Sequence, residues 1–167
     1  MDGICQGRHI IHNIIRSYMT FKGNIYITDP SYIAKSEDWM EEFDPLMESI
    51  DCPEFSNAIM RSTGIGDGSW KVYETKQHNI SEIQAIIQNG DYSQYNVIGE
   101  FSVDSACASV VYQHEADMYN PSFIPTFKDK PHCWALIENF DGEVKTYYDS
   151  EGELHFIGIG NRCFFTA

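Results

Sequence analysis

The sequence predicts an α+β fold that is mainly an antiparallel β-sheet, with about six to eight strands and about two or three short helices. The 167 residues suit a single domain over residues 1–167, with residues 1–18 as an N-terminal extension. Hydrophobic residues make up 43% of the chain and charged residues 22%, which is ordinary for a globular protein and excludes a disordered chain. Short turns join the expected strands beyond residue 96, which favours antiparallel pairing.

The N-terminal third is predicted to combine one strand with short helices. Residues 23–28 form a strand that ends at the turn Asp29-Pro30-Ser31. Ser36 suits the N-cap of a helix, and Asp44 suits the N-cap of a second helix that begins with Pro45. The apolar stripe of these helices consists of Trp39, Phe43, Leu46, Met47 and Ile50.

The middle of the chain is predicted as a β-hairpin followed by a helix. Strands at 57–62 and 70–74 flank the glycine-rich loop 63–69, whose glycines allow unusual backbone angles. Asn79 is the N-cap of a helix that Gly90 terminates. The apolar face of this helix consists of Ile80, Ile83, Ile86 and Ile87.

The second half of the chain is predicted to consist of strands. The dipeptide Asp141-Gly142 is typical of a two-residue hairpin turn, and Ser150-Glu151-Gly152 marks a second turn. Residues 162–166 are predicted as an edge strand. The other strands are expected at 97–103, 107–113, 133–139, 143–148 and 154–158. The predicted core consists of Trp39, Phe43, Ile83, Ile86, Val103, Val110, Trp134, Leu136 and Phe156.

The chain is strongly acidic. It has 11 Lys and Arg against 25 Asp and Glu, a net charge of −14, so direct binding to nucleic-acid phosphates is not expected. No apolar run approaches the ~20 residues of a membrane span, and the first residues lack the pattern of a secretory signal. The five cysteines form no C-x-x-C pair, which favours free thiols and a cytoplasmic location.

Many of the acidic residues gather in one segment. Residues 37–54 contain no Lys or Arg, so the segment either is a solvated face that aids solubility or offers an anionic surface to a basic partner. A second acidic group lies on the expected C-terminal turns, at Asp141, Glu143, Asp149, Glu151 and Glu153. The residues predicted to bind the partner are Glu37, Asp38, Glu41, Glu42, Asp44 and Glu48.

Three aspartates at strand ends are candidate metal ligands. Asp29, Asp67 and Asp104 each lie next to turn residues, and if these ends converge, the carboxylates offer the oxygen ligands that Ca²⁺ and Mg²⁺ prefer. Asp is also a common turn former, because its side chain accepts hydrogen bonds from nearby backbone amides. Both interpretations remain open at the level of sequence.

The sequence contains no recognised catalytic signature. It has no Gly-x-Ser-x-Gly elbow, no His-Glu-x-x-His motif and no phosphate-binding loop. Cys133 and its neighbour His132 point to opposite faces of the expected strand, which is unfavourable for a Cys–His pair. The sequence therefore favours a protein without enzymatic activity and without a cofactor.

Three segments resemble a loose group of small phage and bacterial proteins. They are Gly-Asn-Ile-Tyr-Ile-Thr-Asp-Pro-Ser-Tyr-Ile (23–33), Ser-Thr-Gly-Ile-Gly-Asp-Gly-Ser-Trp-Lys-Val-Tyr (62–73) and Gly-Glu-Phe-Ser-Val-Asp-Ser-Ala (99–106). In that group one strand ends in Gly-Asp-Pro-x-Tyr, a hairpin carries Gly-Asp-Gly-x-Tyr and a later strand ends in Val-Asp-Ser-Gly. This chain has Thr28 in place of the first glycine, Trp70 in place of the tyrosine and Ala106 in place of the last glycine. The resemblance spans roughly residues 19–160 and implies a β-rich fold and a phage or mobile-element origin, but no activity.

These observations lead to one main functional hypothesis and two alternatives. The main hypothesis is an acidic, phage-type binding protein that inhibits a basic host protein that binds nucleic acid, such as a CRISPR nuclease, in the host cytoplasm. One alternative is a hydrolase or metal-dependent protein that uses Asp29, Asp67 and Asp104. The other is a small-molecule sponge with the aromatic loop 119–127 as its lid. The sequence assigns no oligomeric state.

Overall fold

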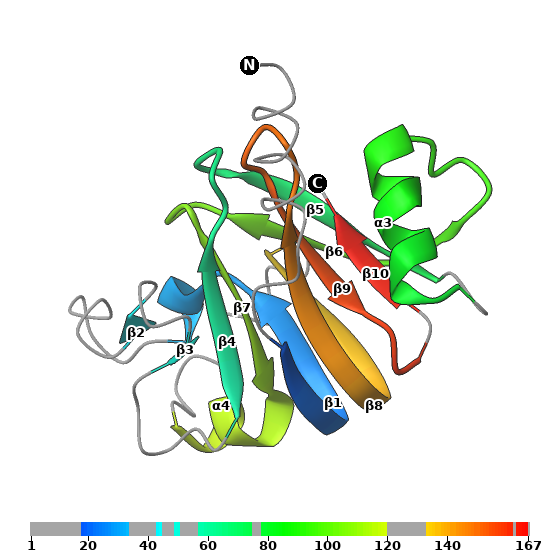
Figure 1. Cartoon of the computed structure of the whole chain (residues 1–167). Coiled ribbons are helices and arrows are strands. Elements are labelled where there is room, and N and C mark those ends of the chain that lie inside the picture. Colours follow the sequence, from blue (N-terminus) through cyan, green and yellow to red (C-terminus); the bar gives the residue numbers. More distant parts are fainter. Residues whose placement is uncertain are drawn as a thin grey trace.

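The structure is an eight-stranded antiparallel sheet that curls into a half-barrel (Figure 1), which confirms the predicted β-rich architecture. The computed structural model describes residues 18–33, 43–44, 49–50, 57–74, 78–119, 133–161 and 163–166. The strand order in the sheet is β4-β7-β1-β8-β9-β10-β5-β6, and β2 and β3 form a separate pair. None of the helices in the described residues is long and apolar enough to cross a membrane.

The strands lie close to their predicted positions. The sheet strands are β1 (Tyr18–Thr28), β4 (Ala58–Ser62), β5 (Gly68–Glu74), β6 (Asn96–Val103), β7 (Cys107–Tyr112), β8 (Trp134–Tyr148), β9 (Leu154–Gly158) and β10 (Cys163–Thr166). The other elements are η1 (Pro30–Tyr32), β2 (Phe43–Asp44), β3 (Ser49–Ile50), α3 (Ile80–Asn89) and α4 (Gln113–Tyr119).

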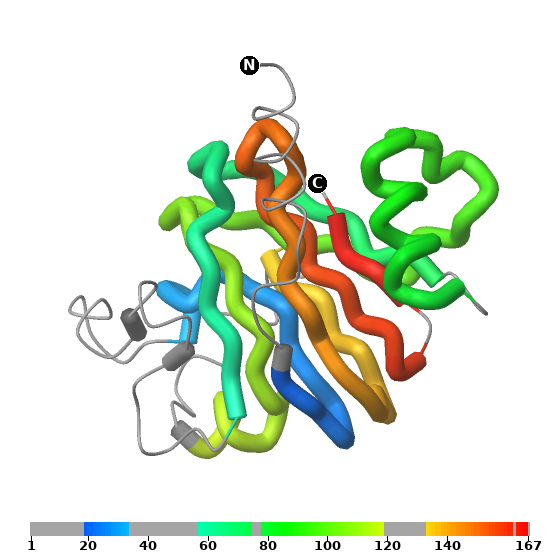
Figure 2. Tube along the Cα trace, viewed as in Figure 1, coloured from blue at the N-terminus to red at the C-terminus, as the bar shows by residue number. Residues whose placement is uncertain are grey.

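The sheet curls because β1 and β8 bend together. They form one continuous antiparallel ladder, from Tyr18 opposite Lys145 to Thr28 opposite Trp134, with a register shift between Gly23 and Ile25. Figure 2 shows both strands folding back at this point. A bulge bends a strand and increases its twist, and the bend in β8 uses positive φ angles of 54° at Asn139 and 148° at Gly142.

This bend corrects the hairpin that Asp141-Gly142 predicts. The predicted strands 133–139 and 143–148 are two parts of β8, and both pair with β1 instead of with each other. Only the second part of β8 also pairs with β9, from Val144 opposite Gly158 to Tyr148 opposite Leu154. The turn predicted at 150–152 is confirmed as the link between β8 and β9, with the Gly152 N–H donating to the Asp149 carbonyl at 3.0 Å.

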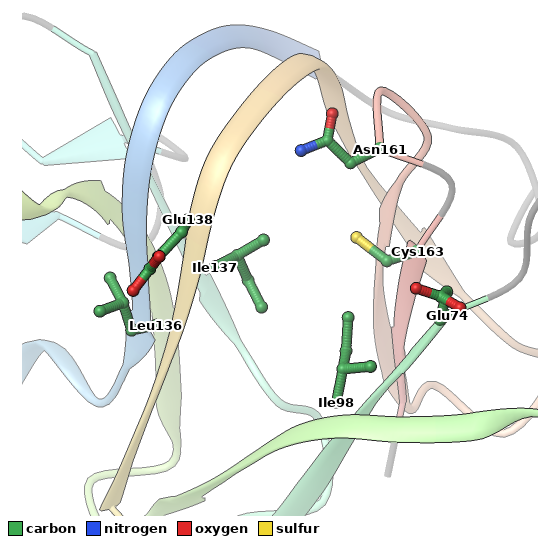
Figure 3. A pocket seen from close by; sticks show the side chains of 7 residues that line it. All are labelled: Glu74, Ile98, Leu136, Ile137, Glu138, Asn161 and Cys163. Atoms are coloured by element: carbon green, nitrogen blue, oxygen red, sulfur yellow. The ribbon is translucent and has the colours of Figure 1, made fainter.

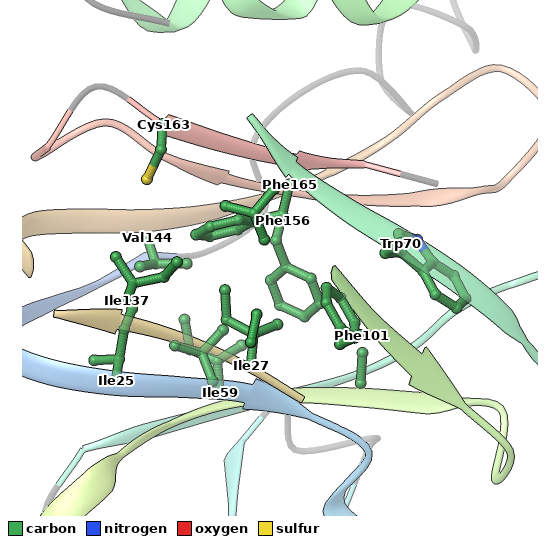
Figure 4. Packing of buried hydrophobic residues seen from close by; sticks show 14 of the residues in the cluster. Ile25, Ile27, Ile59, Trp70, Phe101, Ile137, Val144, Phe156, Cys163 and Phe165 are labelled. Carbon is green, nitrogen blue, oxygen red and sulfur yellow. The ribbon is translucent and has the colours of Figure 1, made fainter. Parts of the chain in front are cut away.

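The main core lies inside the curled sheet. Apolar side chains from all the sheet strands meet there (Figure 4). Trp70 is 1% exposed, stacks on Phe101 with ring centroids 5.8 Å apart, and donates its indole N–H to the Leu154 carbonyl at 3.4 Å. Of the predicted core residues, Val103, Val110 and Phe156 are buried here.

Two further clusters cover the outside of the curled sheet, over different strands. Over β5, β9 and β10, helix α3 packs Ile83 and Ile87. Over β1, β4 and β7, Ile33 at the end of η1 and Ala116 of α4 join a cluster around Tyr26. Strands that are covered on both faces lose the alternation of buried and exposed residues, which explains the continuous burial of β4, β7, β9 and β10.

The α3 helix is confirmed with both of its caps. The Asn79 side chain accepts a hydrogen bond from the Glu82 N–H, and Gly90 ends the helix in the left-handed conformation. Of its two predicted core residues, Ile83 is buried and Ile86 is half-buried.

Several other predictions need correction. β10 is not an edge strand, because it lies between β9 and β5. The helices predicted across 43–50 are wrong where the structure describes them, since Phe43–Asp44 and Ser49–Ile50 pair as short strands. Helix α4 lies where the sequence predicts the end of a strand and a loop.

Two predicted core residues on β8 are only half-buried. Trp134 and Leu136 pack at the margin of the outer cluster around Tyr26, and the Trp134 ring meets Tyr26 edge to face at 5.7 Å. The cost of about 3–5 kcal/mol for truncating a fully buried tryptophan therefore applies to Trp70 rather than to Trp134. Trp39 and the side chain of Phe43 lie outside the described part of the chain.

We expect the substitution Gly142→Ala to destabilise the protein by more than about 2 kcal/mol. A Cβ at Gly142 would lie 2.3 Å from the Gly160 Cα, and backbone there has little room to shift. Gly66→Ala is the matched control, because Gly66 also has a positive φ (89°) but a Cβ added there would meet no atom within 4 Å. Strain alone at Gly66 costs about 1 kcal/mol. Urea unfolding measures the free energy of unfolding of both variants. If Gly142→Ala and Gly66→Ala lose the same free energy, the close approach of the β8 bend to Gly160 is contradicted.

Candidate functional site

The three aspartates singled out in the sequence converge at one end of the half-barrel. The turns 29–33, 63–67, 104–106 and 149–153 all meet there, and Figure 1 shows the last three at the upper end. The Thr63 N–H donates to the Ala106 carbonyl at 2.9 Å, and the Leu154 N–H donates to the Thr63 carbonyl at 3.1 Å. Residues far apart in sequence therefore form one surface.

Asp29 organises this end from inside. Its side chain is fully buried and accepts hydrogen bonds from the Asp104 N–H at 2.9 Å, from the Ser105 N–H at 2.7 Å and from the Ser105 hydroxyl at 2.6 Å. It also accepts from the Ser31 N–H at 2.8 Å, which caps η1. A carboxylate with four donors fixes the end of β1 to the turn between β6 and β7.

Asp67 and Asp104 lie on the outside of the same turns. Asp67 accepts a hydrogen bond from the Ala106 N–H at 3.2 Å, and Asp104 accepts one from the Tyr32 hydroxyl at 3.1 Å. Partial burial, followed by the neighbouring Asp29 carboxyl, raises the pKa of Asp104 above its usual value, and the Tyr32 hydroxyl acts in the opposite direction. The arrangement therefore holds Asp104 beside other carboxylates at a cost in free energy.

The contacts of these three aspartates agree with the role of turn formers. The Asp29 oxygens accept backbone and hydroxyl donors, and Asp67 accepts a backbone donor. Among the residues that the structure describes, no group of three or more His, Cys, Asp or Glu side chains is placed to hold a metal ion. These contacts stabilise the turns, and binding of a metal ion by the three aspartates stays a prediction.

The surface above Asp29 is acidic. We define the acidic end as Asp67, Asp104 and Glu151, which are exposed, together with the half-buried Glu153. The four turns that build it contain no Lys or Arg. In the described part of the chain, the Lys and Arg residues all lie outside these turns. They are Lys22, Arg61, Lys71 and Lys145.

Most of the acidic residues predicted to bind a partner cannot be placed on this surface. Glu37, Asp38, Glu41, Glu42 and Glu48 lie outside the described residues. Only the backbone of Asp44 is described, in β2. Of the second acidic group, Asp149, Glu151 and Glu153 belong to the turns of the acidic end, whereas Asp141 and Glu143 lie at the bend of β8.

A buried network that was not predicted from the sequence lies near the acidic end. His155 is 4% exposed; one of its ring nitrogens contacts the Thr166 hydroxyl at 2.5 Å and the other contacts Asp149 at 3.2 Å. Burial lowers the pKa of His155, although Asp149 acts in the opposite direction. Thr166 is fully buried, so no substrate reaches its hydroxyl in this structure, and the network ties β10 to the β8–β9 turn. The sequence offers one indication of this network, a single histidine within the otherwise apolar strand 154–158.

We expect Asp29→Ala to destabilise the protein by at least about 3 kcal/mol, because it leaves several donors without their charged acceptor. Asp67→Ala is the control: Asp67 is exposed and accepts a single backbone hydrogen bond, at 3.2 Å, so we expect a loss of about 1 kcal/mol or less. Urea unfolding followed by tryptophan fluorescence measures both. If Asp29→Ala and Asp67→Ala lower the free energy of unfolding by similar amounts, Asp29 does not organise this end of the half-barrel.

We expect Asp104→Asn to stabilise the protein at neutral pH by up to about 1 kcal/mol, since the charge is exposed and screened. The folded state raises the pKa of Asp104, so ionisation of this group disfavours folding once the pH exceeds that raised pKa. The advantage of the variant should disappear as the pH falls below the unfolded value of about 4. Unfolding midpoints across this pH range measure the difference, and an advantage that persists at low pH would contradict the assignment.

The exposed carboxylates of the acidic end have the charge that attracts Lys and Arg side chains. Comparisons of the chain with protein-family models, with characterised proteins and with solved structures find no match.

Proposed function

We propose that this protein is a non-enzymatic, phage-type binding protein whose acidic surface occupies a basic surface of a host protein that binds nucleic acid, such as a CRISPR nuclease. The observation that carries the proposal is the acidic end: Asp67, Asp104 and Glu151 are exposed on turns that contain no Lys or Arg. The net charge of −14 has the same sign and adds to the field of this end.

The proposed mechanism is electrostatic mimicry. A groove that binds nucleic acid is lined with Lys and Arg that neutralise phosphates, and the carboxylates of the acidic end would compete for the same cations. Asp29 contributes indirectly, because its hydrogen bonds to Asp104 and Ser105 keep the turn in place before the partner arrives. A surface that is organised in advance loses less conformational entropy on binding.

The predicted segment from Glu37 to Glu48 would add a second group of carboxylates for the basic partner. It carries no Lys or Arg between residues 37 and 54, and its role in binding stays a prediction. The proposal therefore has two separable parts, the acidic end and this segment, and each can be neutralised by substitutions that leave the other unchanged.

We expect the triple variant Asp67→Asn, Asp104→Asn and Glu151→Gln to bind the basic partner between about threefold and about 150-fold more weakly. Three exposed charge pairs contribute about 0.2–1 kcal/mol each, and the amide side chains still accept the hydrogen bonds of the turns. The measurement is capture from a bacterial lysate at about 0.1 M and about 1 M salt, where the Debye length falls from about 10 Å to about 3 Å. The captured protein is then tested for nucleic-acid cleavage with and without this protein.

The matched control is Glu82→Gln, Asp91→Asn and Asp141→Asn. These three side chains are also exposed, and the variant has the same change in net charge, but the residues lie away from the acidic end. We expect this control to retain capture and inhibition. If both variants lose capture of the partner equally, binding depends on net charge alone. If capture persists in about 1 M salt and the triple variant of the acidic end loses none of it, the proposal is contradicted.

A further inference from the structure

The half-barrel is open between two strand edges. Within the described residues, β6 pairs only with β5 and is the last strand of the sheet. The first part of β8, from Trp134 to Glu143, pairs only with β1, because its ladder with β9 begins at Val144. β6 and β8 approach closely at Gly99, where a Cβ would lie 3.1 Å from the Ala135 Cβ. Beyond this contact the two edges diverge around a cavity.

We call this cavity the mouth. It has a volume of about 360 Å³ and is lined by Glu74, Ile98, Leu136, Ile137, Glu138, Asn161 and Cys163 (Figure 3). This volume lies at the lower end of the range for ligand pockets, about 300–1,000 Å³. Three consecutive residues of β8 line it, so the mouth runs along the unpaired edge of that strand. Figure 3 shows the bent β1–β8 ribbon arching over it.

The β6 side of the mouth carries exposed apolar side chains. Val97 is 50% and Ile98 is 45% exposed, and they are two of the four large apolar residues that are exposed in the described part of the chain. The ladder with β5 passes from Gly99 opposite Val72 to Val97 opposite Tyr73, so Ile98 is the extra residue of a β-bulge. A bulge re-aims a side chain, and Figure 3 shows Ile98 directed into the mouth.

The charges around the mouth favour a basic occupant. Glu138 belongs to its lining and is exposed, and Glu100 is exposed further along β6. β6 contains no lysine or proline, so its own side chains bring no positive charge to the mouth. A second copy of this chain would bring the same glutamates and another net charge of −14 to the interface, so like charges disfavour self-pairing.

We propose that the mouth binds an extended segment of the basic partner as an added β-strand. The segment pairs its backbone with β8 at Leu136–Glu138, places an apolar side chain on Ile98 and places a Lys or Arg side chain beside the exposed Glu138. In such strand addition, main-chain hydrogen bonds supply affinity and side-chain pockets supply specificity. The identity of the occupant rests on the proposed function, whereas the binding mode rests on the cavity and on two strand edges that no other described strand covers.

The probe is an acetylated and amidated peptide of four Lys-Val repeats, with binding followed by fluorescence anisotropy and by amide exchange. We expect the peptide to bind and to slow the exchange of the backbone amides of β8 at 136–138. A peptide of the same sequence with alternate backbone nitrogens methylated should bind at least about tenfold more weakly, because it lacks donors for the ladder at unchanged charge. A peptide of four Asp-Val repeats should not bind.

The matched pair of protein variants is Ile98→Lys and Val97→Lys. Both residues are about half exposed and both changes add one positive charge, but only Ile98 lines the mouth. We expect Ile98→Lys to weaken peptide binding at least about tenfold, since the new side chain enters the mouth and its charge competes for Glu138, and Val97→Lys to leave it nearly unchanged. Circular dichroism and the unfolding midpoint establish that both variants are folded.

Several outcomes would overturn the inference. They are no binding of the Lys-Val peptide to the wild-type protein, equal binding of the methylated peptide, equal loss in both lysine variants, or self-association in sedimentation that Ile98→Lys abolishes. The triple variant of the acidic end separates this inference from the proposed function. If partner capture depends on Asp67, Asp104 and Glu151 while the peptide does not bind, only the mouth is refuted; if the peptide binds at the mouth and no basic partner is captured, the proposed function fails.

Discussion

The joint bend of β1 and β8 is the constraint on which the rest of the structure depends. Because both strands turn at the same place in their ladder, one sheet forms two facing layers without a break in hydrogen bonding. The first part of β8 then lies in one layer beside β1, and the second part leads into β9 and the other layer. The core between these layers, the mouth at their unpaired edges and the position of the β8–β9 turn all follow from this bend.

The bend also brings together the parts of the acidic end. The β8–β9 turn reaches the loop between β4 and β5, where the Gly64 Cα has no room for a side chain beside the Gly152 carbonyl. Asp29 then fixes the β6–β7 turn to the end of β1. Partial burial, followed by the neighbouring Asp29 carboxyl, raises the pKa of Asp104, so the ionised form of Asp104 is held in this turn at a cost in free energy.

The sequence predicted the elements better than their arrangement. Caps and periodicity are local, so Asn79 and Gly90 correctly placed the ends of α3. Asp141-Gly142 has the local chemistry of a hairpin turn, but the bend there depends on pairing with β1, more than a hundred residues earlier in the chain. The same limitation applies to the site: Asp29, Asp67 and Asp104 were recognised individually, whereas their convergence depends on the bend, and the contact of His155 with Thr166 depends on the docking of β10.

The two proposed surfaces would respond differently to solution conditions, because they use different interactions. The acidic end is exposed and depends on charge, so salt screens it. The mouth would combine main-chain hydrogen bonds with apolar contacts at Ile98, Leu136 and Ile137, which salt weakens much less. β6 connects the two surfaces, since Ile98 lies at the mouth and Asp104 directly follows Val103 at the other end of the strand. A partner that contacts both would therefore approach quickly through the acidic end and dissociate slowly through the mouth, so that charge governs the rate of association and strand pairing governs the lifetime of the complex.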